Sequence, residues 1–167
     1  RVEVCERITV GGEILIPLSR LEIERVVDCV RAANPQSCAV CFLFAFQNPE
    51  HERAVTDELR RSLPDIEVCA SFEVQPEFRE FERFSTTVLN AYLQPVMAQY
   101  MTELDNGLKS MVPNASFGLN QSSGGLMSVG RAQRLPVRTA LSGPAAGVVG
   151  AAYVAGAAQR PNAITLD

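Results

Sequence analysis

The start of the chain changes from a hairpin pattern to a helical one. Residues 2–10 and 13–17 flank a Gly-Gly pair, a two-residue turn signal that predicts a β-hairpin. A helix is then predicted over residues 20–33, with Ser19 as its N-cap. Its apolar positions recur at helical spacing and are expected to face the core: Leu21, Val26, Val27 and Val30.

The middle of the chain alternates between strand and helix patterns. Residues 38–46 form an uninterrupted apolar run, which predicts a strand covered on both faces. An amphipathic helix is predicted over residues 50–62, with its charged residues outward. Residues 66–72 predict a second strand, and a long helix follows over about residues 77–111, where Pro95 should kink or divide it. The inward positions of the helix before the second strand are expected to be Ala54, Val55 and Leu59.

The last part of the chain continues this order. We predict a strand over residues 116–121, a short helix near Ser128, a helix over residues 143–158 and a final strand over residues 163–166. The alternation favours an α/β fold, a layered sheet of parallel strands with helices, preceded by the hairpin. Residues 140–158 carry no charge, but their Ala and Gly content gives little drive for membrane insertion. We therefore expect a buried helix there and no membrane contact.

Composition narrows the classes of partner and compartment. The 167 residues carry a formal net charge of −4 without any run of Lys or Arg, which argues against a nucleic-acid partner. The five cysteines lie in apolar surroundings and indicate reduced thiols in a cytoplasmic protein. Cys38 and Cys41 are expected on opposite faces of the predicted strand, so they should not share a metal ion. His51 is the single histidine, which excludes a two-His metal site within this chain.

Two glycine-containing segments could bind an anion. The segment QSSGG at residues 121–125 follows a predicted strand, where open α/β sheets place ligands and glycines let backbone N–H groups face an anion. The segment SGPAAGVVG at residues 142–150 predicts a helix capped by Ser142, and helix N-termini attract anions. An ordinary turn and a helix packed closely on a sheet are the alternatives. Since neither a Walker lysine nor a Gly-x-Gly-x-x-Gly pattern is present, a P-loop or Rossmann site is excluded.

A third set of candidates lies on the long predicted helix. A nearly continuous polar stripe, at steps of three and four, is formed by Arg79, Arg83, Thr86 or Thr87, and Asn90. One interpretation is a solvated face with Glu–Arg pairs. The other is that part of the stripe enters a cleft and holds a carboxylate, a carbonyl or a phosphate, because Thr and Asn are poor helix formers.

These motifs, in this order, resemble the hydantoinase/oxoprolinase family. The resemblance is carried by residues 80–95, QSSGG at 121–125 and SGPAAGVVG at 142–150, with support from residues 39–43 and 48–52. It covers nearly the whole chain. The family includes the A-type subunits of ATP-dependent hydantoinases, 5-oxoprolinases and related subunits of acetone-type carboxylases.

The resemblance implies a fold and an activity. It implies an internal piece of a ribonuclease-H-like, actin-like ATPase lobe, with residues 1–167 as a single α/β unit and residues 140–167 as the start of the second nucleotide-binding half. The parent protein is expected to bind ATP and Mg and to open cyclic amides of the hydantoin or 5-oxoproline type by phosphoryl activation of the carbonyl. A second subunit or a fused partner domain is expected. A ketone-carboxylase subunit is the alternative within the family, and a non-catalytic assembly module is the alternative of another class.

The resemblance also assigns the candidate residues. Arg83, Thr87 and Asn90 are the substrate-side candidates, and Asp167 would be the Mg-side or phosphate-side aspartate of an acidic glycine-rich loop. A first loop of that type is expected upstream of Arg1, so the isolated chain is expected to have no ATPase activity. The residues expected to line the nucleotide cleft are Ser123, Gly124, Gly125, Ser142, Gly143 and Pro144.

Overall fold

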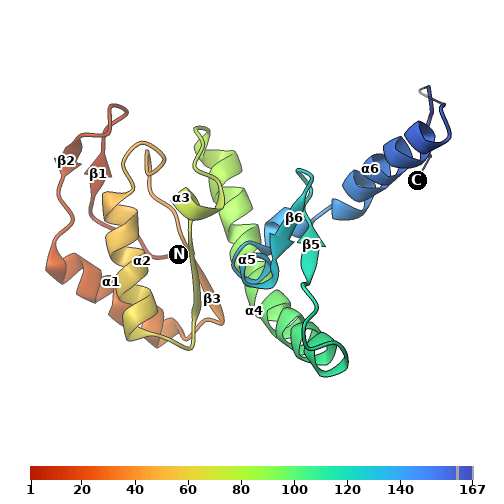
Figure 1. Cartoon of the computed structure of the whole chain (residues 1–167). Coiled ribbons are helices and arrows are strands. Elements are labelled where there is room, and N and C mark those ends of the chain that lie inside the picture. The colour runs from red at the N-terminus through yellow and green to blue at the C-terminus, as the bar shows by residue number, and fades with distance from the viewer. Residues whose placement is uncertain (161, 167) are drawn as a thin grey trace. The chain divides into compact units, whose positions relative to one another are not determined.

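The computed structural model describes residues 1–160 and 162–166 (Figure 1). The chain divides into two compact units, Arg1–Pro95 and Val96–Asp167. Both units combine helices with two-stranded sheets, so the coarse α/β prediction is confirmed. In the part of the chain that the structure describes, no helix has the length and apolar content needed to cross a membrane.

The first unit begins with the predicted hairpin. Strands β1 (Arg7–Ile8) and β2 (Ile14–Ile16) pair antiparallel, and both are shorter than the apolar runs that predict them. Gly12 closes the turn with φ 85°, a backbone conformation that favours glycine, and its N–H donates to the carbonyl of Thr9 at 3.0 Å. The rest of each apolar run has no strand partner among the described residues, so only a short ladder of backbone hydrogen bonds joins the two strands.

Helix α1 (Arg20–Ala33) begins and ends as predicted. The Ser19 hydroxyl accepts the backbone N–H of Glu22 at 3.2 Å, and Asn34 ends the helix in the left-handed conformation. The three valines of the apolar stripe are buried, but the prediction for Leu21 is wrong, because this side chain is 77% exposed. Leu21 precedes the first valine by five residues, which places it about 140° from that valine around the helix.

Strands β3 (Ser37–Val40) and β4 (Glu67–Ala70) form the predicted parallel pair, with helix α2 (Glu50–Ser62) as the connection between them. Strand β3 ends six residues earlier than predicted, because residues 43–47 form turns in which Phe44 has φ 59°. Strand β4 ends before the short helix α3 (Ser71–Val74), so that predicted strand was also too long.

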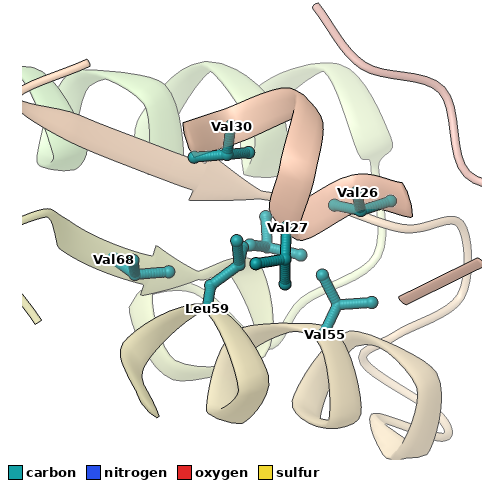
Figure 2. Close-up of a cluster of buried hydrophobic side chains, with 7 residues drawn as sticks. Val26, Val27, Val30, Val55, Leu59 and Val68 are labelled. Atoms are coloured by element: carbon teal, nitrogen blue, oxygen red, sulfur yellow. The ribbon is translucent and has the colours of Figure 1, made fainter. Parts of the chain in front are cut away.

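The hydrophobic core of the first unit lies between α1, α2 and this strand pair (Figure 2). In β4, Val68 points into this core. The next residue, Cys69, points to the opposite face of the sheet and contacts Thr87. The sheet therefore has α1 and α2 on one face and the first part of helix α4 (Glu80–Met111) on the other. Helix α4 continues through Pro95, where the two units meet along the chain. The core residues are Val26, Val27, Val30, Val40, Val55, Leu59 and Val68.

The second unit differs from its prediction. Strands β5 (Gly118–Asn120) and β6 (Leu126–Ser128) form an antiparallel hairpin rather than part of a parallel sheet. Helix α5 (Val129–Arg134) is the predicted short helix, and the 3-10 helix η1 (Pro136–Thr139) follows it. A small cluster of Met101, Met127 and Ala132 forms its core.

The last helix of this unit, α6 (Ser142–Ala157), occurs where a helix is predicted but is not buried. None of its residues is buried among the described residues, although the absence of charge predicted a core helix. Residues 162–166 lie outside any helix or strand, so the strand expected over 163–166 is also wrong. A buried helix and a final strand both need neighbouring helices or strands to pack or pair with, and the described part of this unit neither buries α6 nor pairs a strand with residues 163–166.

Candidate functional site

A set of fully buried polar residues lies at the carboxyl ends of β3 and β4. The residues come from three helices: one from α2, one from the start of α3 and three from α4. Each of them has no exposed surface. The carboxyl end of parallel strands is where open α/β sheets place their ligands. We call this set the buried polar cluster; its members are Glu52, Ser71, Arg83, Thr87 and Asn90.

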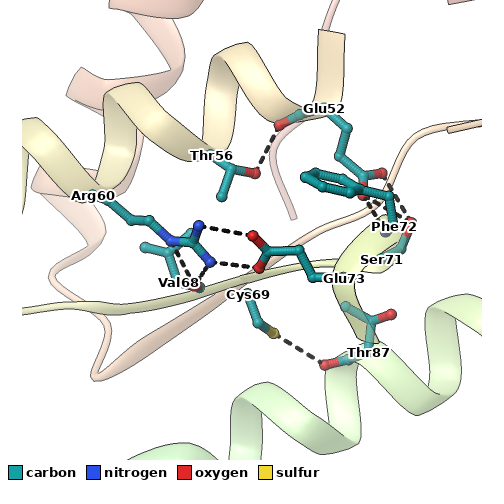
Figure 3. A network of polar contacts seen from close by, with 9 residues as sticks. All are labelled: Glu52, Thr56, Arg60, Val68, Cys69, Ser71, Phe72, Glu73 and Thr87. Carbon is teal, nitrogen blue, oxygen red and sulfur yellow. Dashed lines mark hydrogen bonds and ion pairs between the residues drawn. The ribbon is translucent and has the colours of Figure 1, made fainter. Parts of the chain in front are cut away.

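Glu52 is the centre of hydrogen bonding in the cluster (Figure 3). Its carboxylate accepts the backbone N–H of Phe42 at 2.6 Å and of Phe72 at 2.9 Å, and the hydroxyl of Ser71 at 2.9 and 3.0 Å. Burial raises the pKa of Glu52, and the backbone and hydroxyl donors oppose that rise. One side chain thus ties helix α2 to the chain segments that follow both parallel strands.

The prediction that the charged residues of α2 face outward is wrong for Glu52. Its position is three residues before Val55 and seven before Leu59, so it lies on the same inward face of the helix. This spacing could have indicated, from the sequence alone, that Glu52 faces the interior. The hydrogen-bond donors of Glu52 could not be predicted from its neighbours in the sequence, because they come from segments up to 20 residues away.

Arg83 is buried on the α4 side of the cluster. Its Nη2 donates to the carbonyl of Phe42 at 2.7 Å, and its guanidinium lies 5.3 Å and 5.2 Å from the ring centroids of Phe46 and Phe84. The Nε and Nη1 atoms have no hydrogen-bond partner among the described residues. The positive charge of Arg83 favours the ionised form of Glu52, and the Phe42 backbone bonds to both side chains, through its N–H to Glu52 and through its carbonyl to Arg83.

Thr87 and Asn90 join the cluster to strand β4. The Thr87 hydroxyl donates to the carbonyl of Arg83 at 2.7 Å, and the Thr87 carbonyl accepts the Cys69 thiol at 3.5 Å. Burial raises the pKa of Cys69 to about 11, although a hydrogen bond with Asn90 lowers it in part. The structure therefore brings the three substrate-side candidates of α4 together, but in a buried position rather than on a solvated face.

The cysteines do not form a reactive or metal-binding centre among the described residues. Burial is the main cause that raises the pKa of Cys41 to about 12, and the charge of Glu52 adds to it. A thiol with such a pKa is protonated at neutral pH and is a poor nucleophile. No group of His, Cys, Asp and Glu that could hold a metal ion occurs in residues 1–160 and 162–166. Cys41 lies just after β3, so the predicted strand geometry does not describe it.

The contacts of the His51 side chain were not predicted from the sequence. It lies in the first turn of α2, as predicted, and it is nearly fully buried. Its Nδ1 lies 2.9 Å from the Glu6 carboxylate, and its Nε2 accepts the backbone N–H of Leu18 at 3.3 Å. Both ring nitrogens are used, so the residue fastens the two ends of the N-terminal hairpin to α2.

The QSSGG segment forms the turn of the β5–β6 hairpin. Gly124 and Gly125 have φ 86° and 77°, and a Cβ at either position would meet no atom within 4 Å. Their conformation is explained by the turn, which was the alternative to an anion site. The Ser122 N–H and hydroxyl both donate to the carbonyl of Arg138, at 2.9 and 3.0 Å, and Ser123 beside it is exposed.

Helix α6 begins with Ser142, Gly143 and Pro144, but the expected cap is absent. Leu141, in the left-handed conformation, precedes the helix, and no side chain caps its first turn. Ser142 is itself the first helical residue, so its hydroxyl does not take the capping position. The hydrogen bonds to Arg138 connect the Ser122 turn to η1, which leads into this helix. Asp167, the metal candidate, lies outside the described residues.

Two family models match most of the chain. The model of the hydantoinase/oxoprolinase family matches residues 83–167, and the model of the hydantoinase/oxoprolinase N-terminal region matches residues 1–63. The first match includes all the α4, hairpin-turn and α6 candidates.

Individual relatives agree with these matches. The caprolactamase subunit alpha of Pseudomonas jessenii is 35% identical over 96% of this chain and 23% of its own length. A crystal structure of that ATP-dependent caprolactamase has a TM-score of 0.77 at 31% identity and covers 91% of this chain and 22% of its own. The 5-oxoprolinase of Saccharomyces cerevisiae is 33% identical over 77% of this chain and 10% of its own length.

A carboxylase is equally similar in structure. Nucleotide-free acetone carboxylase, which carries out ATP-dependent acetone carboxylation, has a TM-score of 0.77 at 28% identity, over 92% of this chain and 22% of its own. The acetone carboxylase beta subunit of Xanthobacter autotrophicus is 32% identical over 90% of this chain. The chain spans about a fifth of the length of the caprolactamase and acetone carboxylase subunits and about a tenth of the length of the 5-oxoprolinase. It belongs to the hydantoinase/oxoprolinase family.

Proposed function

We propose that the protein carrying this chain is an ATP-dependent hydrolase that opens cyclic amides. The observation that carries the proposal is the similarity to the ATP-dependent caprolactamase, which extends over 91% of the chain with a TM-score of 0.77. The similarity to a 5-oxoprolinase supports the same class of substrate. A lactam or hydantoin ring is the substrate class.

The proposed reaction activates the amide before water attacks it. The terminal phosphoryl group of ATP is transferred to the ring carbonyl oxygen, so that oxygen becomes part of a leaving group. Water then attacks the carbonyl carbon, and the ring C–N bond breaks with protonation of the nitrogen, which leaves an acyl phosphate. A second water attacks the same carbon, and inorganic phosphate leaves with the former carbonyl oxygen. Catalysis of such a transfer depends on positioning and on stabilising phosphate charge.

We assign the second unit to the nucleotide side of this enzyme. Ser123, Gly124 and Gly125 would approach the phosphates through their backbone, and the open space around the two glycines supports this. The first turn of α6, with Ser142, Gly143 and Pro144, lacks a side-chain cap, which leaves N–H groups for an anion. Asp167 as the Mg ligand rests on the family resemblance alone.

We assign the buried polar cluster to the substrate side. The two partnerless nitrogens of Arg83 support a role in holding a carbonyl or carboxylate oxygen. Thr87 and Asn90 are proposed as further substrate-side residues, since both are buried on the same face of α4 as Arg83. An actin-like, ribonuclease-H-like lobe is the proposed context, with residues 1–167 as one unit of it and residues 140–167 as the start of its second nucleotide-binding half.

Two other functions have support of their own. A ketone-carboxylase subunit, in which phosphorylation activates a ketone toward bicarbonate, is favoured by the equal TM-score of acetone carboxylase. A non-catalytic assembly module is favoured by relatives that are named as subunits, which also supports a partner subunit or fused domain.

The test is phosphate release by the complete protein with its partner subunit. We expect release from Mg-ATP to depend on a lactam, 5-oxoproline or hydantoin and not on a ketone with bicarbonate. Release that depends on ketone and bicarbonate would instead establish the carboxylase. If neither substrate stimulates release, the assembly module is favoured. The isolated chain of residues 1–167 is expected to release no phosphate.

A further inference from the structure

The first half of α4 has its polar and apolar faces reversed. Four polar residues of this half are buried, together with Ala91: Arg83, Thr87, Asn90 and Gln94. Four residues on the opposite face are large and apolar, and their exposed fractions are 82%, 57%, 47% and 75%. We call this second set the outer stripe; it consists of Phe81, Val88, Leu89 and Tyr92.

A helix on the surface of a protein normally has the opposite arrangement, with its apolar stripe toward the core. Rotation of α4 cannot correct the reversal, because the inward residues are held by specific contacts. Arg83 bonds to the Phe42 carbonyl, and the Thr87 backbone carbonyl accepts the Cys69 thiol. The outer stripe therefore stays on the outside of this unit unless something else covers it.

Three of the four outer-stripe residues also lack charged neighbours along the chain, whereas Phe81 lies between Glu80 and Glu82. No charged residue occurs between Arg83 and Glu103, a stretch that includes most of the stripe. By contrast, the outer faces of α1 and α2 carry surface ion pairs, such as Arg20–Glu24 and Arg61–Glu58. Exposed apolar patches without interspersed charge mark surfaces that are buried in the working protein.

We propose that the outer stripe is covered by an apolar face of the same polypeptide, in a segment outside these 167 residues. The chain spans only 21–23% of the relatives that match nearly all of it, so most of such a polypeptide lies elsewhere in the sequence. An interface with so little charge resembles a domain core rather than a transient contact. Helix α4 would then be an interior helix, with the buried polar cluster on one side and a hydrophobic layer on the other.

The test is hydroxyl-radical footprinting of the complete, unmutated protein without its partner subunit, read for Phe81 and Tyr92 by mass spectrometry. Exposed fractions of 75–82% would give fast oxidation of both rings. We expect oxidation at least about ten-fold slower than for these residues in the unfolded protein, and no change on dilution.

A second measurement uses thiol labelling and a matched control. Val88→Cys and Ala32→Cys each place one thiol at an exposed position, on α4 and on the last turn of α1. We expect maleimide to label position 32 quickly and position 88 slowly in the complete protein. Fast oxidation and labelling of the stripe would overturn the proposal. Protection that requires the partner subunit, or that disappears on dilution, would overturn it in favour of a partner subunit or a second copy.

Discussion

The two units of this chain differ in how far they supply their own contacts. The first unit, Arg1–Pro95, packs two helices on a parallel strand pair and closes a buried polar cluster on the other face. The second unit, Val96–Asp167, has a small core and ends in α6, an uncharged apolar helix with no buried residue. An all-apolar helix is normally buried, so the two units differ in their cores: the first has a core formed by its own helices and strands, whereas α6 finds none among the described residues.

The largest expected effect is on the buried polar cluster. Glu52→Ala removes the acceptor for two backbone N–H groups and the Ser71 hydroxyl, and leaves the Arg83 charge uncompensated. We expect the free energy of unfolding of the first unit to fall by about 3–5 kcal/mol. Urea unfolding of the 167-residue chain, followed by circular dichroism, measures it. A loss below about 1 kcal/mol would show that the cluster does not hold the unit together.

A pair of apolar-to-alanine substitutions, one in each unit, tests the contrast between the units directly. Leu59→Ala removes a fully buried side chain and should cost about 2–5 kcal/mol. Val148→Ala on α6 removes an exposed one and should change stability by less than about 0.5 kcal/mol in the same chain. Equal losses in the two variants would remove the distinction that we draw between the units.

The buried thiols predict a pH dependence of the first unit. The pKa values of Cys41 and Cys69 are raised by burial from 9.0 to about 12 and about 11. The folded state therefore keeps the protons that the unfolded state loses, so stability is complete below pH 9 and falls as the pH rises toward 11–12. Unfolding midpoints measured across this range should decrease, and Cys41→Ala with Cys69→Ala should flatten the curve. A wild-type profile that is already flat would contradict the burial of these thiols.

The smallest effects are expected at glycines. Gly125 has φ 77°, so Gly125→Ala should cost about 1–2 kcal/mol despite the open space around it. Gly150 lies in α6, where a Cβ meets no atom within 4 Å, so Gly150→Ala should stabilise the isolated chain by about 0.5–1 kcal/mol. Thermal unfolding of both variants gives the signs. A destabilising Gly150→Ala would show that α6 is closely packed in this chain after all.

Local signals explain what the sequence predicted well. The Gly-Gly turn, the Ser19 cap and the apolar spacing of α1 and α2 depend on neighbours within a few residues, and these elements occur where expected. The end of β3 could not be predicted in this way. It is fixed beyond Val40 by the bond between the Phe42 N–H and Glu52, which joins residues ten apart.

The candidate site was predicted only in part, because the burial of its residues depends on contacts between segments that are distant in the sequence. The polar stripe of α4 identified Arg83, Thr87 and Asn90 correctly as one face, but their burial depends on a turn and a strand from elsewhere in the unit. Likewise, the QSSGG glycines could not be assigned to a hairpin turn without knowing that β5 pairs with β6.

Activation of the amide carbonyl by phosphorylation is tested by an isotope experiment. The complete protein is given Mg-ATP and a lactam whose carbonyl oxygen is ¹⁸O, and the released phosphate is analysed by mass spectrometry. Phosphoryl transfer to the carbonyl, followed by attack of both waters on the carbon, predicts one ¹⁸O atom in each phosphate released with ring opening. Ring opening that leaves all of the ¹⁸O in the product acid would contradict the account.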